Sequence, residues 1–403
     1  MNRLILLLFI SVLIGCAEKP VEEVTIDPDK ILTQNVSKIK ETLKTQTVKD
    51  GFPRNIPKND TTWKTVGVND WCSGFYPGIL WYAYEYSEEA SIKESAEAFT
   101  APLQSIAFSP ASNHDIGFMV YCSYGNGYRL TGNEDYKKVL LSAADTLATL
   151  YNPTVGSILS WPSQKQYRHN TIIDNMMNLE LLFWAAKNGG SNELYKIAES
   201  HAEVTMKNLI RPDSSAFHVG SFNEETGAFI KGVTHQGYAD DSMWARGQTW
   251  GIYGFSIAYR ETGRDDFLDT AIKVSDHFLN RLPEDGIPFW DFDAPKMANT
   301  PKDASAAAIA ACGLLELSKL VDNKTLSQKY AEAAKGLITK LSSKDYLSGD
   351  INQALLLHST GHYPKNSEID MSIVYGDYYY MEALLRLKNL EEKPETAPLA
   401  KVK

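Results

Sequence analysis

Side chains that can bind a ligand are concentrated between His235 and Trp250, in the stretch HQGYADDSMWARGQTW. A run of glycines and apolar residues follows, which predicts that a buried helix begins here. Asp241 or Ser242 is placed to cap that helix. Arg246 and Trp250 lie four residues apart and therefore share one helix face. Because a guanidinium can grip a carboxylate while an indole covers a sugar ring, the stretch predicts an anionic, ring-shaped ligand. The alternative is a loop with aromatic packing and one surface ion pair.

Two aspartates are candidates for acid–base chemistry, Asp115 in HDIGF and Asp174 in TIIDNMMNL. Burial and a neighbouring carboxylate raise the pKa of a carboxyl group, whereas a helix N-terminus lowers it. If the first two effects prevail, Asp174 is partly protonated at about pH 6 and can donate a proton. We expect Asp115 to ionise first, since an acceptor that holds hydroxyl groups works best when charged. The alternative is that both aspartates only cap helices.

Helices of two kinds alternate along the chain. A helix without a polar face must be buried, whereas an amphipathic helix can line the outside of a fold. The amphipathic segments are Asp29–Lys49, Glu88–Ala107, Asn133–Leu150, Ser191–Leu209, Asp265–Leu282 and Thr325–Leu341. The segments that are apolar nearly all round are Ser73–Tyr86, Asp115–Leu130, Thr171–Lys187, Arg246–Thr262, Ala304–Val321 and Gly376–Leu390.

An internal repeat supports the same arrangement. YRLTGNEDYKKVLLSAAD at Tyr128 is echoed by YRETGRDDFLDTAIKVSD at Tyr259, and an aromatic residue follows corresponding turns at Tyr136, Tyr195, Phe267 and Tyr330. Repeated helix pairs stack side by side. Six pairs can close into an all-α ring, an (α/α)6 barrel. An open solenoid is the alternative, but a ring better explains six apolar helices.

Such a barrel gathers the N-termini of its six inner helices at one mouth. The unusual residues fall there, since Trp71, His114, Asp174 and Trp244 each lie at the start of an apolar segment. Long loops are usually functional in a compact domain. Four loops can cover this mouth: Asn152–Asn170, Arg211–Met243, Pro283–Asp303 and Ser342–Tyr375.

The first residues predict the compartment. Arg3 precedes a short apolar run that ends in Leu13-Ile14-Gly15-Cys16, which resembles the lipobox of bacterial lipoproteins. We therefore interpret residues 1–16 as a lipoprotein signal peptide with lipidation at Cys16, and expect a lipid-anchored protein in the bacterial cell envelope. A plain secretory signal or a short apolar helix is the alternative. Residues 17–28 form a tether, 29–392 a single catalytic domain and 393–403 a C-terminal tail.

Composition excludes several classes of function. The net charge of −10 argues against nucleic acid as a partner. Cys72, Cys122 and Cys312 form neither a disulfide framework nor a zinc pattern, so we predict buried thiols. No metal site or cofactor is expected, because the acidic pairs lack the spacing of a calcium loop.

From WCSGF at Trp71 to GDYYY at Gly376, the chain resembles the unsaturated glucuronyl hydrolases of glycoside hydrolase family 88. The motifs that carry the resemblance are HDIGF at His114, DNMMNL at Asp174 and WARGQTWGIYG at Trp244. It implies an (α/α)6 barrel that removes a 4,5-unsaturated uronic acid from the non-reducing end of lyase-generated oligosaccharides. The implied reaction is hydration of a vinyl ether rather than ordinary glycoside hydrolysis.

The resemblance also implies roles for particular residues. Asp174 matches the acid that protonates C4 and then activates water, and Asp115 matches the second essential aspartate, which holds the ring hydroxyls. The positions that match the substrate pocket are Trp71, His114, Trp161, His218, Gly232, Thr234, Gln236, Trp244, Arg246 and Trp250. Ser242 stands where some members have a further tryptophan. We would look for contacts to the second sugar in His358–Met371.

Three other functions compete with this interpretation. Unsaturated rhamnogalacturonyl hydrolases share the barrel and the chemistry, but Gln248 and Thr249 favour the glucuronyl family. Sugar epimerases share the barrel but use paired histidines. A lipid-anchored glycan-binding protein would need the tryptophans and would leave Asp115 and Asp174 without a task. The sequence leaves open the parent polysaccharide and its sulfation, the face of the envelope and the oligomeric state.

Overall fold

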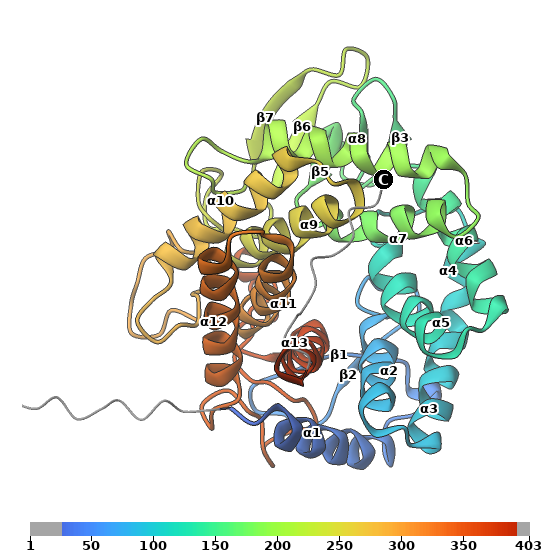
Figure 1. The fold of residues 1–403 in the computed structure, drawn as a ribbon, viewed down its shortest axis with the longest axis vertical. Helices are drawn as coiled ribbons and strands as arrows, with labels where there is room; N and C mark the ends of the chain where they lie inside the picture. The colour runs from blue at the N-terminus through green and yellow to red at the C-terminus, as the bar shows by residue number, and fades with distance from the viewer. Residues whose placement is uncertain (1–25, 393–403) are drawn as a thin grey trace, which may run out of the picture.

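The computed structural model describes residues 26–392 as one ring of inner helices surrounded by outer helices (Figure 1). The chain runs round the ring from the blue α1 through green to orange, and the red α13 returns beside α1 and α2. The predicted signal peptide, Cys16, most of the tether and the C-terminal tail lie outside the described residues.

Six inner helical segments, buried on most sides, line the centre. They are α2 (Phe75–Ser87), a π-helix (Gly117–Gly125) continued by α5 (Asn126–Thr131), α7 (Asn175–Lys187), α9 (Ala245–Thr262), α11 (Ala304–Leu320) and α13 (Val374–Glu392). Each packs against the next, and α13 packs against α2, so the ring closes. This confirms the predicted (α/α)6 barrel and is incompatible with an open solenoid.

The outer helices bury only one stripe each. They are α1 (Pro28–Leu43), α3 (Ala90–Thr100), α4 (Gln104–Ala107), α6 (Glu134–Ala148), α8 (Asn192–Leu209), α10 (Asp265–Arg281) and α12 (Lys324–Leu341). The aromatic residues of the repeat anchor these helices to the ring: Tyr195 packs edge-on against Phe183, with ring centroids 5.2 Å apart, and Phe267 lies against Phe255. The sequence repeat therefore corresponds to a contact that recurs between outer and inner helices.

Close approach between α7 and α9 depends on glycine. A Cβ atom at Gly254 would lie 2.4 Å from the Cβ of Met176, and one at Gly247 would lie 2.5 Å from the Trp244 ring. Gly254 thus lets α7 pack closely against α9. The predicted cap of α9 was wrong: Trp244 occupies the N-cap position, and the Ser242 hydroxyl instead donates to Asp291, 2.7 Å away.

Several predicted helix limits were wrong. The segment predicted as one helix from Asp115 is a π-helix followed by α5. Residues 169–172 form a strand, and α7 begins only at Asn175. The segment predicted as Glu88–Ala107 is divided by a 3₁₀ turn that contains Pro102.

Three small antiparallel sheets were not predicted. They consist of β1 (Phe52–Ile56) between β2 (Lys64–Val66) and β8 (Ser372–Ile373), of β3 (Tyr151–Asn152) with β4 (Ser157–Ile158), and of β6 (Val219–Phe222) between β5 (His169–Ile172) and β7 (Phe229–Val233). Since β5 leads into α7 and β8 leads into α13, these sheets lie at the ends where inner helices begin. They shape the rim of the predicted mouth.

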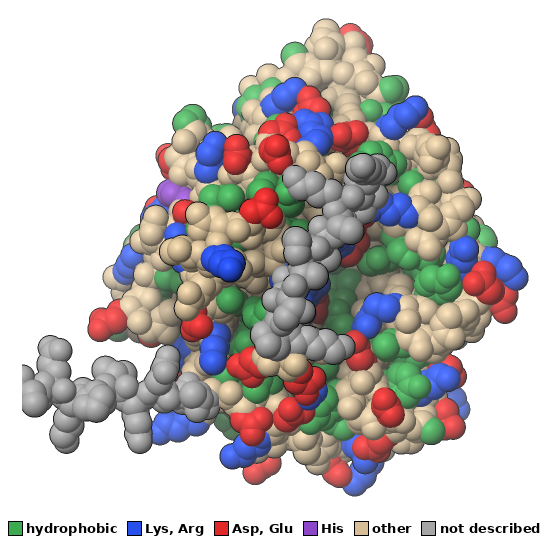
Figure 2. Space-filling view, viewed as in Figure 1, with side chains coloured by type: hydrophobic (Ala, Val, Ile, Leu, Met, Phe, Trp, Pro, Cys, Tyr) green, Lys and Arg blue, Asp and Glu red, His purple; other side chains and the backbone are tan. Residues whose placement is uncertain are grey.

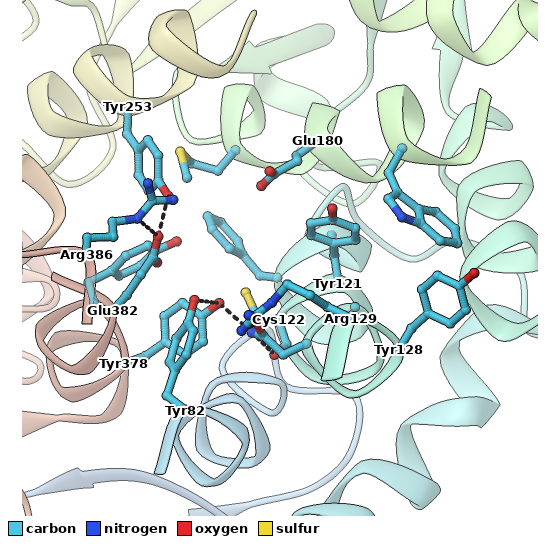
Figure 3. A pocket seen from close by; sticks show the side chains of 17 residues that line it. Tyr82, Tyr121, Cys122, Tyr128, Arg129, Glu180, Tyr253, Tyr378, Glu382 and Arg386 are labelled. Carbon is cyan, nitrogen blue, oxygen red and sulfur yellow. Dashed lines mark hydrogen bonds and ion pairs between the residues drawn. The ribbon is translucent and has the colours of Figure 1, made fainter. Parts of the chain in front are cut away.

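The opposite end of the barrel holds a cavity of about 430 Å³ (Figure 3). Beside it, Glu316 of α11 accepts hydrogen bonds from Arg260 of α9 and Arg386 of α13, and Arg260 also pairs with Glu180 of α7. Arg386 donates to Glu382 as well, 2.7 Å away. These ion pairs tie four neighbouring inner helices together. The charged side chains at this end are therefore paired with one another, and these pairs hold the ring together.

The visible outer face mixes acidic and basic side chains without a large area of one sign (Figure 2). Cys72, Cys122 and Cys312 are free and buried, as predicted. Between residues 26 and 392, no helix has the length and apolar character needed to span a membrane.

Candidate active site

The N-terminal ends of the inner helices bring the candidate residues together. Asp115 lies two residues before the π-helix, and Asp174 occupies the N-cap position of α7. Arg246 is the second residue of α9, and Trp71 precedes α2. Because the inner helices of the closed ring are parallel to one another, their N-terminal ends meet at one mouth, and all four side chains lie there.

Both catalytic candidates are buried carboxyl groups with raised pKa values. Burial raises the pKa of Asp115 to about 7, and the charge of Asp70 adds to this effect. Burial also raises the pKa of Asp174 to about 6, while His114 and Arg246 oppose the rise. Burial therefore dominates the pKa of both groups, and the cation near Asp174 partly offsets it there. In mildly acidic solution the two groups hold protons that ordinary aspartates would have lost.

Two histidines direct their Nε2 atoms at these carboxylates. His114 Nε2 lies 3.4 Å from Asp115 Oδ1, and His218 Nε2 lies 3.8 Å from Asp174 Oδ2. Burial lowers the pKa of His114 to about 4 and that of His218 well below its usual range. Both imidazoles are therefore neutral near pH 7 and can each offer one N–H donor to the site.

Buried polar atoms that have no hydrogen-bond partner among residues 26–392 cluster at this mouth. Buried polar groups are normally hydrogen-bonded, so each exception needs an explanation. The unpartnered atoms here are His114 Nε2, Asp174 Oδ2, both amide atoms of Asn175, His218 Nε2, Trp250 Nε1, Ser359 Oγ, both ring nitrogens of His362 and Tyr375 OH. A ligand with many hydroxyl and carboxylate oxygens would satisfy them.

Arg246 is held by protein groups on several sides. Its Nη1 donates to Asp303 Oδ2 at 2.9 Å and to the carbonyl of Thr360 at 2.6 Å, while Nη2 donates to the carbonyl of Gly361 at 2.7 Å. The guanidinium lies over the rings of Trp244 and Tyr375, and the side chain is 1% exposed. Arg246 thus fastens the 358–371 loop across the mouth. Its predicted grip on a substrate carboxylate stays a prediction.

The tryptophans take different positions around the site. Trp250 is fully buried against Phe118 and Tyr379, so it forms the floor. Trp71 is partly exposed and lies 5.1 Å from the ring of Tyr375. Trp161 is also partly exposed and stands at the rim beside His218. Trp71 and Trp161 therefore present the aromatic faces that a sugar can reach.

The remaining predicted residues belong to the β6–β7 side of the mouth. The Gln236 amide donates to the Gly361 carbonyl, and Trp244 lies 4.5 Å from the His218 ring. Thr234 accepts a hydrogen bond from the backbone of Gly237, which fixes the turn. Gly232 lies against the Phe217 ring, where a Cβ atom would be 2.4 Å from the ring. The structure gives Gly232 and Thr234 a role in shaping the loop.

Sequence reasoning missed Asp303, Tyr375 and Asn175. Asp303 caps α11 and pairs with Arg246, and Tyr375 stands one residue inside α13 with its hydroxyl free. The predicted barrel already implied that these residues belong to the site. If each inner helix start contributes to the mouth, the residues at the starts of α11 and α13 belong to it as well.

We expect Asp115→Asn to change how stability depends on pH. Its folded pKa of about 7 exceeds the ordinary 3.8, so the folded state holds a proton that the unfolded state releases. Stability from this group is therefore present below about pH 4 and is lost as pH rises through about 7. The asparagine variant should lack that loss, and its melting temperature should exceed that of the wild type at about pH 8 by more than at about pH 4. Identical pH dependences would show that Asp115 titrates normally.

Together, the closed double ring and a mouth with two buried carboxyl groups, partly exposed indoles and unpartnered donors define an (α/α)6-barrel carbohydrate-active enzyme. Residues 39–390 match the family described as Glycosyl Hydrolase Family 88. This chain belongs to that family.

Similar proteins agree in sequence and in structure. An unsaturated glucuronyl hydrolase of Formosa agariphila is 43% identical over 85% of this chain and 86% of its own length. One from a Bacillus species is 39% identical over 84% of this chain and 91% of its own length. The crystal structure of an unsaturated glucuronyl hydrolase specific for heparin is 39% identical, with a TM-score of 0.86 over 91% of this chain and 98% of that chain.

Proposed function

We propose that this enzyme removes a 4,5-unsaturated uronic acid from the non-reducing end of glycosaminoglycan-type oligosaccharides by hydrating the vinyl ether. The observation that carries the proposal is the pair of buried carboxyl groups with raised pKa values at the mouth of the closed ring. The relatives support the substrate class: they are named unsaturated glucuronyl hydrolase and, in Streptococcus pyogenes, unsaturated chondroitin disaccharide hydrolase.

The chemistry begins with Asp174. Its carboxyl group donates a proton to C4, and the positive charge that develops at C5 is shared with the ring oxygen. The carboxylate of Asp174 then takes a proton from a water molecule as the water oxygen bonds to C5. The hemiketal so formed opens by breaking the bond from C5 to the ring oxygen, leaving a ketone at C5. The hemiacetal that this exposes at C1 collapses and releases the remaining sugar, so one water is consumed overall.

Asp115, His114 and His218 bind the substrate and do not transfer the proton to C4. Asp115 accepts from ring hydroxyl groups, and the Nε2–H groups of His114 and His218 donate to substrate oxygens. Trp71 and Trp161 cover the sugar faces.

The proposal is tested with unsaturated disaccharides from lyase digestion, with and without sulfate. Hydration destroys the conjugated enol ether, so ultraviolet absorbance should fall as product forms. When the reaction runs in deuterated water, product examined at once by NMR should carry deuterium at C4. Binding without loss of absorbance would leave only a glycan-binding protein, and cleavage that keeps the double bond would make the enzyme an ordinary glycosidase. The panel also identifies the preferred sulfation.

We further propose that Cys16 is lipidated and anchors the protein in the cell envelope. The motive is the charged start, the short apolar run and the lipobox-like sequence before Cys16. Cys16→Ser should move the protein from the membrane fraction to the soluble fraction of a bacterial host. Unchanged fractionation would exclude the anchor.

A further inference from the structure

Asn178 belongs to α7 and faces the start of the π-helix, fully buried and one helical turn after Asp174. Its Oδ1 accepts a hydrogen bond from the backbone N–H of Phe118 at 2.8 Å. Its Nδ2 lies 3.3 Å from Nδ1 of His114. A Cβ atom at Gly117 would lie 2.5 Å from Asn178 Oδ1, so the glycine permits this approach.

The orientation of this amide follows from the backbone. A backbone N–H can only donate, so the Asn178 atom that faces Phe118 must be the oxygen. The atom that faces His114 is then the NH₂ group, which can only donate. His114 Nδ1 must accept this hydrogen bond, and the single proton of the neutral imidazole is left on Nε2.

We infer that Asn178 is a positioning residue that fixes His114 as the Nε2–H tautomer, so that the imidazole presents a donor to Asp115 and the substrate. His218 is fixed in the same tautomer by different means, since the backbone N–H groups of His235 and Gln236 both donate to its Nδ1 at 3.1 Å. Both imidazoles therefore carry their proton on Nε2, the atom that faces a carboxylate of the site. Only the His114 arrangement rests on a side chain that mutation can change.

The tautomer matters because His114 Nε2 faces carboxylate oxygen. With a proton on Nε2, the contact with Asp115 Oδ1 at 3.4 Å is attractive. With the proton on Nδ1, two acceptors would face each other, which would disfavour the ionised carboxylate and remove a donor from the substrate. Burial keeps His114 neutral, and Asp174 is the charged group that acts on it most strongly.

Asn178→Asp tests the inference with a nearly isosteric change. One carboxylate oxygen can still accept from the backbone N–H of Phe118. The other faces His114 Nδ1, and because two acceptors repel each other, Nδ1 must then carry a proton. We expect His114 to become the Nδ1–H tautomer or an imidazolium, and kcat/KM to fall by about tenfold to a hundredfold, the range found when a group that orients a metal-binding histidine is lost. An imidazolium would lower the pKa values of Asp115 and Asp174, so the basic limb of the rate profile should move to lower pH.

The tautomer is read by ¹⁵N NMR of histidine-labelled protein, with the His114 signals assigned by their absence in His114→Gln. The unmodified protein should show an Nε2–H imidazole, and finding Nδ1–H there would overturn the inference even if every variant misfolded. In Asn178→Asp, unchanged His114 signals or an unchanged pH profile would reduce Asn178 to a packing residue. Asn126→Asp is the matched control, because Asn126 is also a buried asparagine of the inner ring but bonds Cys122 and Tyr378 instead. It should leave the His114 signals and the pH profile unmoved.

The inference rests on the proposed function only for its rate measurements. Absence of any turnover in the wild type would contradict the proposed function, whereas the NMR result would still decide the tautomer.

Discussion

Asp174→Asn should give a folded protein that binds substrate and turns it over about a hundred to ten thousand times more slowly. The amide keeps the shape of the carboxyl group but cannot supply a proton to C4 or take one from water. Asp174 is the candidate with an unpartnered buried oxygen, 3.8 Å from His218 Nε2, so it is free to exchange protons with a ligand. The loss should appear in kcat, with KM little changed, in the absorbance assay.

Asp377→Asn provides the comparison. Asp377 is also a buried carboxyl group near an inner helix start, and burial raises its pKa to about 7. However, its two oxygens accept the backbone N–H groups of Leu355 and Leu356. Asp377→Asn should therefore lower the melting temperature while each folded molecule keeps its turnover. If Asp174→Asn retained a tenth or more of wild-type kcat, Asp174 would not be the proton donor.

Arg246→Lys should impair both stability and activity, although the charge is kept. Arg246 uses two nitrogens to reach three acceptors, on Asp303, Thr360 and Gly361, and a single ammonium cannot span them. A hydrogen bond to a charged group contributes about 1.5–3 kcal/mol, so loss of one should be visible in denaturant unfolding. Once the 358–371 loop is released, kcat/KM should fall by roughly tenfold or more, about 1.4 kcal/mol of transition-state stabilisation.

A second arginine separates the two effects. Arg260 is held by Glu180, Glu261 and Glu316 at the opposite end of the barrel. Arg260→Lys should lower stability and leave KM unchanged. If Arg246→Lys also left KM unchanged, neither Arg246 nor the loop that it holds would be needed to bind the substrate carboxylate, which would then bind elsewhere, for example at His218 or Gln236.

The features that follow from periodicity could be predicted from the sequence. Helices buried all round, such as α11, show an unbroken apolar run, and their alternation with amphipathic helices predicts the double ring. The parallel direction of the inner helices then places Asp115, Asp174 and Arg246 at one mouth. These conclusions need only local pattern and the geometry of a closed ring.

Features that depend on contacts distant in sequence could not be predicted. The strand at residues 169–172 exists because Val219–Phe222 pairs with it, and four residues carry too little pattern to reveal this. The segment Gly117–Gly125 reads as an ordinary helix, but it lies against Asn178 and is a π-helix. The shifts of the two aspartate pKa values likewise depend on where Asp70 and Arg246 lie in space.

Closure of the ring also determines how late in folding the site can form. Asp115 and Asp174 come early in the chain, yet Thr360 and Gly361, which Arg246 holds across the mouth, come from its last quarter. Contacts between such distant segments form late, because a long stretch of chain must first be made and then brought together. A chain stopped before Thr360 would carry both aspartates but would lack the loop that Arg246 holds across the mouth. Synthesis must therefore be nearly complete before the protein can meet its substrate.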